Sequence, residues 1–270
     1  MFKNNKIVVF DVDETLGCFT QLGIFCDCLD EYYGNKNYSD SNFNKLLDMY
    51  PNFVRPKMLS ILQYLKEKKR KNKCYKVMMY TNNQGPKKWV LNIKNYFDYK
   101  INYKLFDQII AAFKVSGEIV EPKRTSHDKS IDDFFRCTKL SSDVEICFID
   151  DLFHYKMEDE KVYYINVKPY KYNYLINDMI KIYLKSDLGE IIKNKNNFYN
   201  DMLNIYNKFE YSNNIKNIKE QEIDEIVSKK MYQHIKQFFY ENNNNTLKIN
   251  KKPNNKNKSL RNKKIKQYIK

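Results

Sequence analysis

Five short apolar segments, separated by stretches with helical periodicity, constrain the fold of this chain more than any other feature of its sequence. Each segment is rich in β-branched, aromatic or other apolar residues and is too short for a typical helix, which favours buried strands. The segments are IVVF (7–10), KVMMY (76–80), QIIAAF (108–113), EICFID (145–150) and VYYINV (162–167). Strands that alternate with helices predict an α/β fold with a mainly parallel sheet and helices on both faces.

The stretches between these segments show the spacing of amphipathic helices. After Arg55-Pro56, apolar residues between 58 and 65 recur at i, i+3, i+4 and i+7, and a charged run follows them. Pro86 is a favourable first helical residue. Further helices are predicted from there to Phe97 and over 128–137, and the pattern is helical throughout after about residue 175. The candidate helices in that part are 175–188, 198–209 and 217–240.

These patterns predict three regions. Residues 1–190 form the α/β domain, in which 18–55, with a polar patch at 34–42, is a small insertion or lid. Residues 191–241 form a helical extension, and 242–270 form a basic tail with ten basic residues and no acidic residue. The tail therefore accounts for most of the net charge of +15 and leaves +5 for the rest. Its low apolar content and single sign of charge predict disorder.

The sequence favours a protein made and kept inside a cell, in the cytoplasm or nucleus. It contains no run of about 18 apolar residues, which a membrane helix requires. The apolar run near the N-terminus is too short for a signal peptide, so we expect no secretion. The six cysteines include no Cys-x-x-Cys pair and lie mostly in apolar segments, as is typical of reduced thiols in a protein core.

Polar side chains cluster where three of the predicted strands end. Asp11, Asp13 and Glu14 follow the first strand, Thr81-Asn82-Asn83-Gln84-Gly85 follows the second, and Asp150-Asp151 closes the fourth. Any one of these stretches could be only a turn or a helix cap. Ligands bind at the carboxyl ends of parallel strands, where the carboxylates would repel one another without a cation. We therefore expect Mg²⁺, held by one or two carboxylates and by phosphate oxygens of a substrate.

The spacing of Asp11 and Asp13 has a chemical reason. At i and i+2 of an extended chain both side chains lie on one side, with Val12 pointing away. One carboxylate can then attack phosphorus while the other handles the proton of the leaving group. A lysine and a hydroxyl, Lys129 and Thr81, would bind the remaining phosphate oxygens. Lys123, Arg124 and Lys139 also lie between the third and the fourth predicted strands.

The order of these motifs resembles that of the haloacid dehalogenase superfamily. The motifs are DVDET, then TNNQG, then a lysine, and finally Asp150-Asp151. The resemblance covers roughly residues 5–170. It implies that Asp11 is a nucleophile that forms an aspartyl-phosphate and that Asp13 is the general acid and base. It also implies that Thr81, Asn82 and a lysine bind the phosphoryl group. Lys129 is favoured over Lys123 because it lies about one helix before the fourth strand, where the superfamily pattern places its lysine. Mg²⁺ would lie on Asp11, the Asp13 main-chain carbonyl, and Asp150 or Asp151.

Glu14 and the helix after Arg55-Pro56 are similar to the NLI-interacting-factor-like, or CTD-phosphatase-type, group, whose members act on phosphoserine in proteins. Glu14 stands where many members of the superfamily carry glycine, and we assign it no chemistry. Two departures leave the substrate open. TNNQG is closer to the Thr-Asn-Gln-x-Gly of polynucleotide 3′-phosphatases and small-molecule phosphatases, and Asp150-Asp151-Leu152 replaces Asp-Asn-Ser-Pro.

Three functions follow from these observations. The favoured one is a Mg²⁺-dependent phosphomonoesterase acting on a phosphoserine or phosphothreonine protein. A second is a nucleic-acid 3′-end or nucleotide phosphatase, suggested by TNNQG and the basic tail. A third is a non-catalytic binding module whose tail holds nucleic acid electrostatically. His127 and His154 lie near the motifs, but the expected chemistry requires no histidine.

Overall fold

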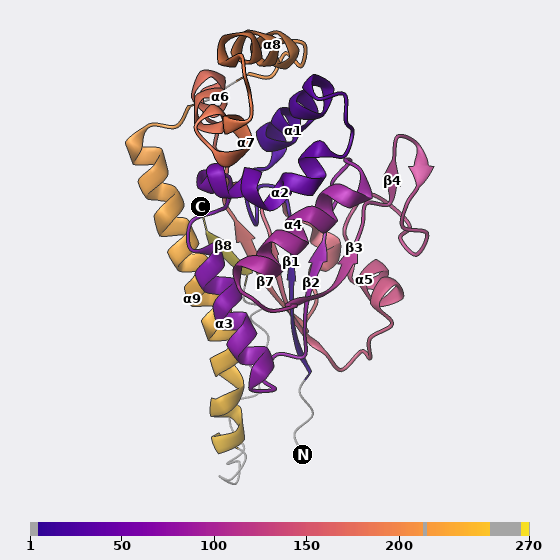
Figure 1. The fold of residues 1–270 in the computed structure, drawn as a ribbon. Helices are drawn as coiled ribbons and strands as arrows, with labels where there is room; N and C mark the ends of the chain where they lie inside the picture. The colour runs from indigo at the N-terminus through magenta and orange to yellow at the C-terminus, as the bar shows by residue number, and fades with distance from the viewer. Residues whose placement is uncertain (1–4, 213–214, 249–265, 270) are drawn as a thin grey trace.

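A central sheet of five parallel strands organises the protein (Figure 1). The structure, a computed structural model, describes residues 5–212, 215–248 and 266–269. The strand order is β3-β2-β1-β6-β7, with bounds β1 Lys6–Phe10, β2 Lys76–Tyr80, β3 Phe106–Ile110, β6 Glu145–Asp150 and β7 Val162–Val167. The predicted α/β fold with a parallel sheet is confirmed, and its architecture is Rossmann-like.

Two smaller β elements accompany this sheet. β8, Lys266–Ile269, pairs in parallel with β7 and adds a sixth strand at that edge. β4, Lys114–Val115, and β5, Glu118–Ile119, form a short antiparallel hairpin beyond β3. β3 is therefore the other edge strand of the sheet, next to the hairpin.

The predicted strands agree with the observed ones except at β3. β2, β6 and β7 have the predicted bounds, and β1 begins one residue early, at Lys6. The third strand, predicted at 108–113, lies at 106–110. It starts earlier because the Asp107 carboxylate accepts a hydrogen bond from the Val77 main-chain N–H, at 2.8 Å, where the pairing with β2 changes register. Ala111 and Ala112 consequently follow the strand as a loop.

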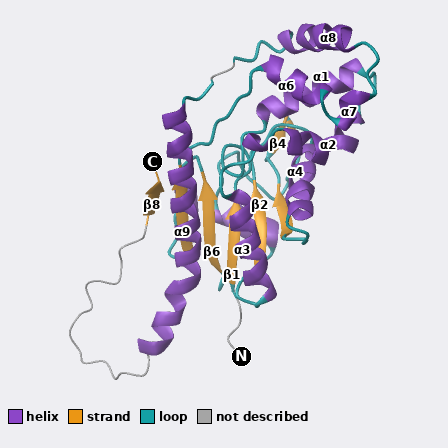
Figure 2. Cartoon of the chain, turned by 60° about the vertical axis from the view of Figure 1, so that its left-hand side comes forward, coloured by secondary structure: helices purple, strands orange, loops and turns teal. Residues whose placement is uncertain are grey.

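Side chains of the sheet alternate between two apolar layers, as the period of a strand requires. Val8 and Phe10 face the larger layer, which is covered by α3, α4 and α9, whereas Ile7 and Val9 face the smaller layer under α5. The bounds of these helices are α3 Met58–Arg70, α4 Lys87–Lys100, α5 Ile131–Thr138 and α9 Ile218–Lys248. Figure 2 shows α9 running along the side of the sheet.

A group of helices, here termed the helical lobe, stands over the carboxyl ends of the strands (Figures 1 and 2). It consists of α1 Thr20–Tyr32, α2 Tyr38–Met49, α6 Ile176–Leu184, α7 Asp187–Glu190 and α8 Lys195–Asn207. The predicted insertion 18–55 thus supplies two helices, followed by a 3-10 turn at Pro51–Phe53. The predicted helix 175–188 is two helices, α6 and α7.

The helices of the predicted extension 191–241 belong to different places, since α8 packs in the lobe on α1 and α9 packs on the sheet. α9 continues to Lys248, beyond the predicted boundary at 241. Of the tail predicted as disordered, 249–265 and 270 lie outside the described residues, and 266–269 form β8.

Two further observations bear on the environment of the protein. All six cysteines are buried and carry free thiols. Across the described ranges, no helix combines the length and the apolar character that crossing a membrane demands.

Candidate active site

Three aspartates meet at the carboxyl ends of the two central strands. Asp11 directly follows β1, Asp150 is the last residue of β6, and Asp151 comes next in the chain. Since β1 and β6 pair in parallel, Asp11 and Asp150 come together, and both are almost completely buried. One carboxylate oxygen from each of the three lies within 4.8 Å of the others, an arrangement that could hold a metal ion.

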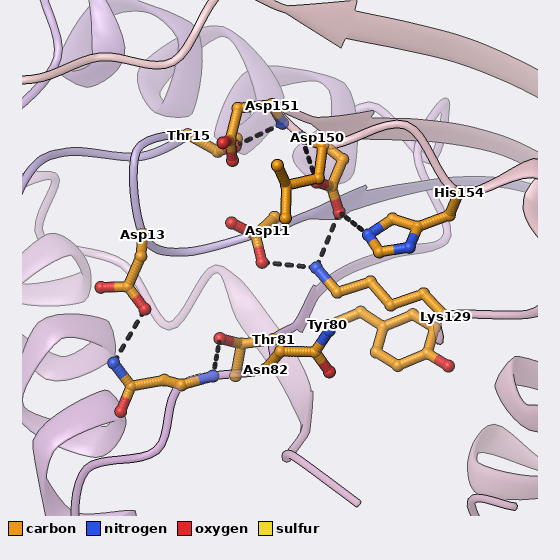
Figure 3. Close-up of polar contacts among 12 residues, drawn as sticks. Asp11, Asp13, Thr15, Tyr80, Thr81, Asn82, Lys129, Asp150, Asp151 and His154 are labelled. Atoms are coloured by element: carbon orange, nitrogen blue, oxygen red, sulfur yellow. Dashed lines mark hydrogen bonds and ion pairs between the residues drawn. The ribbon is translucent and has the colours of Figure 1, made fainter. Parts of the chain in front are cut away.

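Lys129 lies between two of these carboxylates, as Figure 3 shows. Its Nζ contacts Asp11 Oδ1 and lies 2.7 Å from Asp150 Oδ2, and the side chain is buried in the loop that precedes α5. Lys123, the rival for this position in the sequence, is exposed. One ammonium group opposes three carboxylates, so the cluster of Asp11, Asp150, Asp151 and Lys129 has a formal charge of −2 when all are ionised. A divalent cation would balance that charge.

The carboxylates of the cluster have different proton affinities. Burial raises the pKa of Asp11 well above its ordinary value, although Lys129 opposes the shift. Burial would also raise the pKa of Asp150, but Lys129 and His154 hold it below its ordinary value. Burial and the charge of Asp150 raise the pKa of Asp151 to about 6. Lys129 thus stabilises the ionised form of Asp150, but it does not offset the effects that raise the pKa of Asp11 and Asp151.

Asp13 lies apart from the cluster, with its carboxylate turned away from Asp11 (Figure 3). Asn83 Nδ2 donates a hydrogen bond to Asp13 Oδ2 at 2.8 Å. Burial raises the pKa of Asp13, and the hydrogen bond from Asn83 acts against that shift. A carboxyl group with a raised pKa that lines the same cavity as the carboxylate cluster is suited to proton transfer. Its side chain is not among the three that could hold a metal ion.

The stretch after β2 is held in place by a buried arginine. Arg124 donates to the main-chain oxygens of Thr81, Ala111 and His127, at 3.1, 2.8 and 2.8 Å. It also donates to Asn82 Oδ1 at 2.8 Å, so the carbonyl of that side chain is engaged by Arg124. Thr81 Oγ1 accepts a hydrogen bond from the Asn83 main-chain N–H. This network fixes the turn that carries Thr81, Asn82 and Asn83 beside Asp13.

Arg55 plays the same part for the loop after β1. It donates to the main-chain oxygens of Thr15, at 2.6 Å, and Glu14, at 2.5 Å. The Thr15 hydroxyl donates to Asp151 Oδ1 at 3.0 Å, which links this loop to the one after β6. Glu14 has a left-handed backbone with φ of 57°, a conformation that glycine adopts at little cost. Its carboxylate lies 3.5 Å from Lys171 Nζ, at the rim of the site.

All the residues that the sequence indicated for catalysis, phosphate binding or metal binding line one cavity of about 470 Å³. These are Asp11, Asp13, Thr81, Asn82, Lys129, Asp150 and Asp151. His154 also lines the cavity, with Nε2 at 3.5 Å from Asp150 Oδ2, whereas His127 is exposed and its ring packs on Phe113.

The residues that hold this site together were not identified as such from the sequence. In the sequence, Asn83 stands out only as part of the stretch after the second strand, and Arg124 only as one of several basic residues between the third and the fourth strands. Their roles depend on carbonyl groups and carboxylates far away in the chain, for which a single sequence carries no signal. Arg55 had a weak signal, because an arginine before proline opened the predicted helix.

Comparisons of this chain with protein-family models, with curated proteins and with solved structures find no match.

Proposed function

We propose that this protein is a Mg²⁺-dependent phosphomonoesterase of the haloacid dehalogenase type. The observation that carries the proposal is the position of Lys129 between Asp11 and Asp150, with Asp13 two residues beyond Asp11 on the same loop. This arrangement combines a nucleophile, a separate proton-transfer group and a cation for the phosphoryl oxygens at one end of the sheet.

Hydrolysis would take place in two steps. An oxygen of Asp11 attacks phosphorus, the bond from phosphorus to the leaving oxygen breaks, and Asp13 gives its proton to that oxygen. Water then attacks the aspartyl-phosphate, Asp13 takes a proton from the water, and Asp11 and inorganic phosphate are released. The raised pKa of Asp13 supports the first of its roles, since the group must be protonated when the leaving group departs.

The carboxylates present fit a divalent cation. Asp11, Asp150 and Asp151 offer hard oxygen ligands, which Mg²⁺ prefers, and their excess negative charge calls for a cation. When bound, Mg²⁺ would offset the repulsion between these carboxylates and an incoming phosphate group. Lys129 would stabilise the phosphoryl oxygens, and the Thr81 hydroxyl would donate to one of them.

The substrate we favour is a phosphoserine or phosphothreonine side chain, and the location we favour is intracellular. Six buried free thiols support a reducing compartment. A nucleic-acid 3′-end phosphatase is the competing enzymatic function. The stretch Thr81-Asn82-Asn83-Gln84-Gly85, which suggests it, lines the same cavity through its first four residues.

Hydrolysis of an aryl phosphate by the purified full chain tests the proposal directly. We expect Mg²⁺-dependent release of phosphate, which Asp11→Asn abolishes and which a chelator stops. A trapped phosphoryl group on the protein, released by hydroxylamine and missing in Asp11→Asn, would identify the nucleophile. No phosphate release with Mg²⁺, or full activity in Asp11→Asn, would refute the proposed function.

A further inference from the structure

A second cavity, here termed the edge groove, opens beside the candidate active site. It has a volume of about 440 Å³ and lies between α4, the edge strand β3 and the β4–β5 hairpin. It shares Thr81 and Asn83 with the cavity that contains the aspartates. A molecule whose phosphate group is bound at Asp11 can therefore extend into the edge groove without leaving the protein surface.

The walls of the edge groove are mainly apolar. Val90 and Leu91 of α4 stand on one side, Ile109 and Ala112 belong to the other, and Val120 lies after the hairpin. Leu91 and Val120 are 37% and 39% exposed, so their side chains are accessible to a ligand. Apolar surface of this kind favours the burial of aliphatic side chains.

The charged lining residues of the edge groove are two lysines and two acidic residues, Lys87, Lys94, Asp107 and Glu121, so their formal charges sum to zero. Lys94 Nζ pairs with Asp98 at 2.7 Å, and the Asp107 carboxylate pairs with Lys69 at 2.8 Å. Single-stranded nucleic acid requires a positively charged groove with aromatic platforms for its bases. The edge groove offers neither, so its chemistry fits an uncharged apolar chain better than a polyanion.

The edge strand supplies a second reason to expect a polypeptide. Within the described residues, β2 is the only strand paired with β3, and the opposite side of β3 has no strand partner. Asp107, Gln108 and Ile109, which are consecutive in β3, line the edge groove. An extended peptide can use such main-chain donors and acceptors while it places alternate side chains in the groove.

A third cavity, the lobe cleft, meets the edge groove at Asn83, Gly85 and Pro86. It lies between α1, α2 and α4, has a volume of about 470 Å³, and includes Trp89 in its wall. Its charged lining residues are four carboxylates and two lysines: Asp13, Asp27, Asp30, Asp40, Lys36 and Lys88. The excess of carboxylates would repel the neighbouring phosphates of a nucleic acid, whereas it would tolerate a peptide with basic residues.

We propose that the edge groove binds the polypeptide on one side of the phosphorylated residue, as an extended segment with apolar side chains. This inference rests on the proposed phosphatase function and specifies its substrate. The substrate is a phosphorylated residue in an extended polypeptide segment, with aliphatic residues on one side of the phosphorylated residue. It makes Leu91 and Val120 determinants of specificity that take no part in the chemical step.

Phosphoserine peptides of equal length test this inference. One peptide carries valine or leucine two and four residues before the phosphoserine, one carries them after it, and one carries glycine at all these positions. We expect kcat/KM of wild-type protein to be about tenfold higher for one apolar peptide than for the glycine peptide, as is common for an apolar pocket. Leu91→Glu or Val120→Glu should reduce that ratio to near one.

Leu59→Glu is the matched control, since Leu59 lies on α3 and has the same exposed fraction of 37%. It should leave the ratio of the two kcat/KM values unchanged. Equal rates for all three peptides, or an unchanged ratio in both groove variants, would overturn the inference. A 3′-phosphorylated oligonucleotide with a higher kcat/KM than every peptide would overturn it as well.

The same peptides distinguish a failure of this inference from a failure of the proposed function. If wild-type protein hydrolyses no aryl phosphate, the phosphatase proposal fails, and the edge groove is tested by binding alone. Fluorescence anisotropy of a labelled apolar phosphopeptide should then show tighter binding to wild type than to Leu91→Glu. Equal affinities would exclude the groove as a peptide site.

Discussion

Asn83 and Asp13 form a hydrogen bond of 2.8 Å in which the amide of Asn83 donates to the carboxylate of Asp13. The same side chain accepts a hydrogen bond from the Gly85 main-chain N–H through its Oδ1. Asn83 therefore connects the turn after β2 to the loop after β1 and orients the group that we assign to proton transfer. The relationship makes Asn83 a positioning residue for Asp13.

Replacing Asn83 by aspartate should impair proton transfer. Asn83→Asp keeps an acceptor for Gly85 but removes the donor to Asp13 and adds a like charge. Loss of the donor raises the pKa of Asp13 further, because that hydrogen bond favours its ionised form. We expect kcat to fall by about 10- to 100-fold, a typical cost for the loss of an orienting partner.

The pH profile of kcat separates this role from a structural one. In Asn83→Asp, the limb controlled by Asp13 should shift toward higher pH. A fall in kcat with an unshifted profile would contradict the orienting role, as would unchanged kcat.

In the absence of metal, replacement of Lys129 should destabilise the protein. Added Mg²⁺ should then stabilise the variant more than it stabilises wild type. Lys129→Met leaves Asp11 and Asp150 buried without a cation, and breaking a buried ion pair in this way costs about 3–5 kcal/mol. Mg²⁺ should restore part of that loss, so the rise in Tm on addition of Mg²⁺ should be larger than in wild type.

Thermal unfolding with and without Mg²⁺ measures both effects, and Lys123→Met is the matched control at an exposed lysine. The control should unfold like wild type under both conditions. If Lys129→Met had wild-type stability in chelator, the bridging role of the ammonium group would be wrong.

Arg124 should be required for stability because of the shape of its guanidinium group. Arg124→Lys keeps the positive charge but cannot reach four separate acceptors, three of which are main-chain carbonyls. Each buried acceptor left without a donor costs about 1–3 kcal/mol, so we expect a loss of at least about 3 kcal/mol in the free energy of unfolding.

Urea unfolding checks this value, with Arg70→Lys as the control on an exposed arginine of α3 that pairs with Glu67. The control should change the free energy of unfolding by less than about 0.5 kcal/mol. A comparably small change for Arg124→Lys would show that the network around Thr81 does not depend on Arg124.

His234 should make stability depend on pH below neutrality. Burial lowers its pKa, Lys230 adds to the shift, and Nδ1 lies 3.0 Å from the Tyr163 hydroxyl of β7. The folded state thus binds the proton less tightly than the unfolded chain, whose histidine pKa is about 6.5. The stabilising contribution is complete above that pH and is lost as the pH falls toward the folded pKa.

The midpoint of urea unfolding at pH 7.5 and at pH 5.5 measures this effect as a difference between wild type and His234→Gln. The variant should lose less stability on acidification than wild type. An equal loss in both proteins would mean that His234 does not contribute to the acid sensitivity.

The sequence predicted those parts of the fold that depend on local pattern. β2, β6 and β7 are continuous apolar runs between polar stretches, and their bounds were predicted correctly. β3 was displaced because its start depends on a bond between Asp107 and Val77, two residues of different strands. The sequence describes 18–55 only as an insertion, since α1 packs on α8 and α2 packs on α4, both of which are far away in the chain.

The candidate site shows the same limit. Asp11, Asp13, Thr81 and Asp150-Asp151 were identifiable because strand ends follow directly from strand positions. Lys129 was favoured by its place before β6, and the structure brings it to Asp11 and Asp150. Asn83 and Arg124 could not be given roles, because what distinguishes them is the set of atoms they meet in three dimensions.

Trp89 gives the protein a built-in optical reporter. It is the single tryptophan of the chain, and it lines the lobe cleft. Its indole packs edge-on against Phe43 of α2, and a Cβ atom added to Gly23 of α1 would lie at van der Waals distance from it. The emission of one fluorophore, without any label, therefore responds both to a molecule entering the cleft and to a shift of α1 and α2 relative to α4.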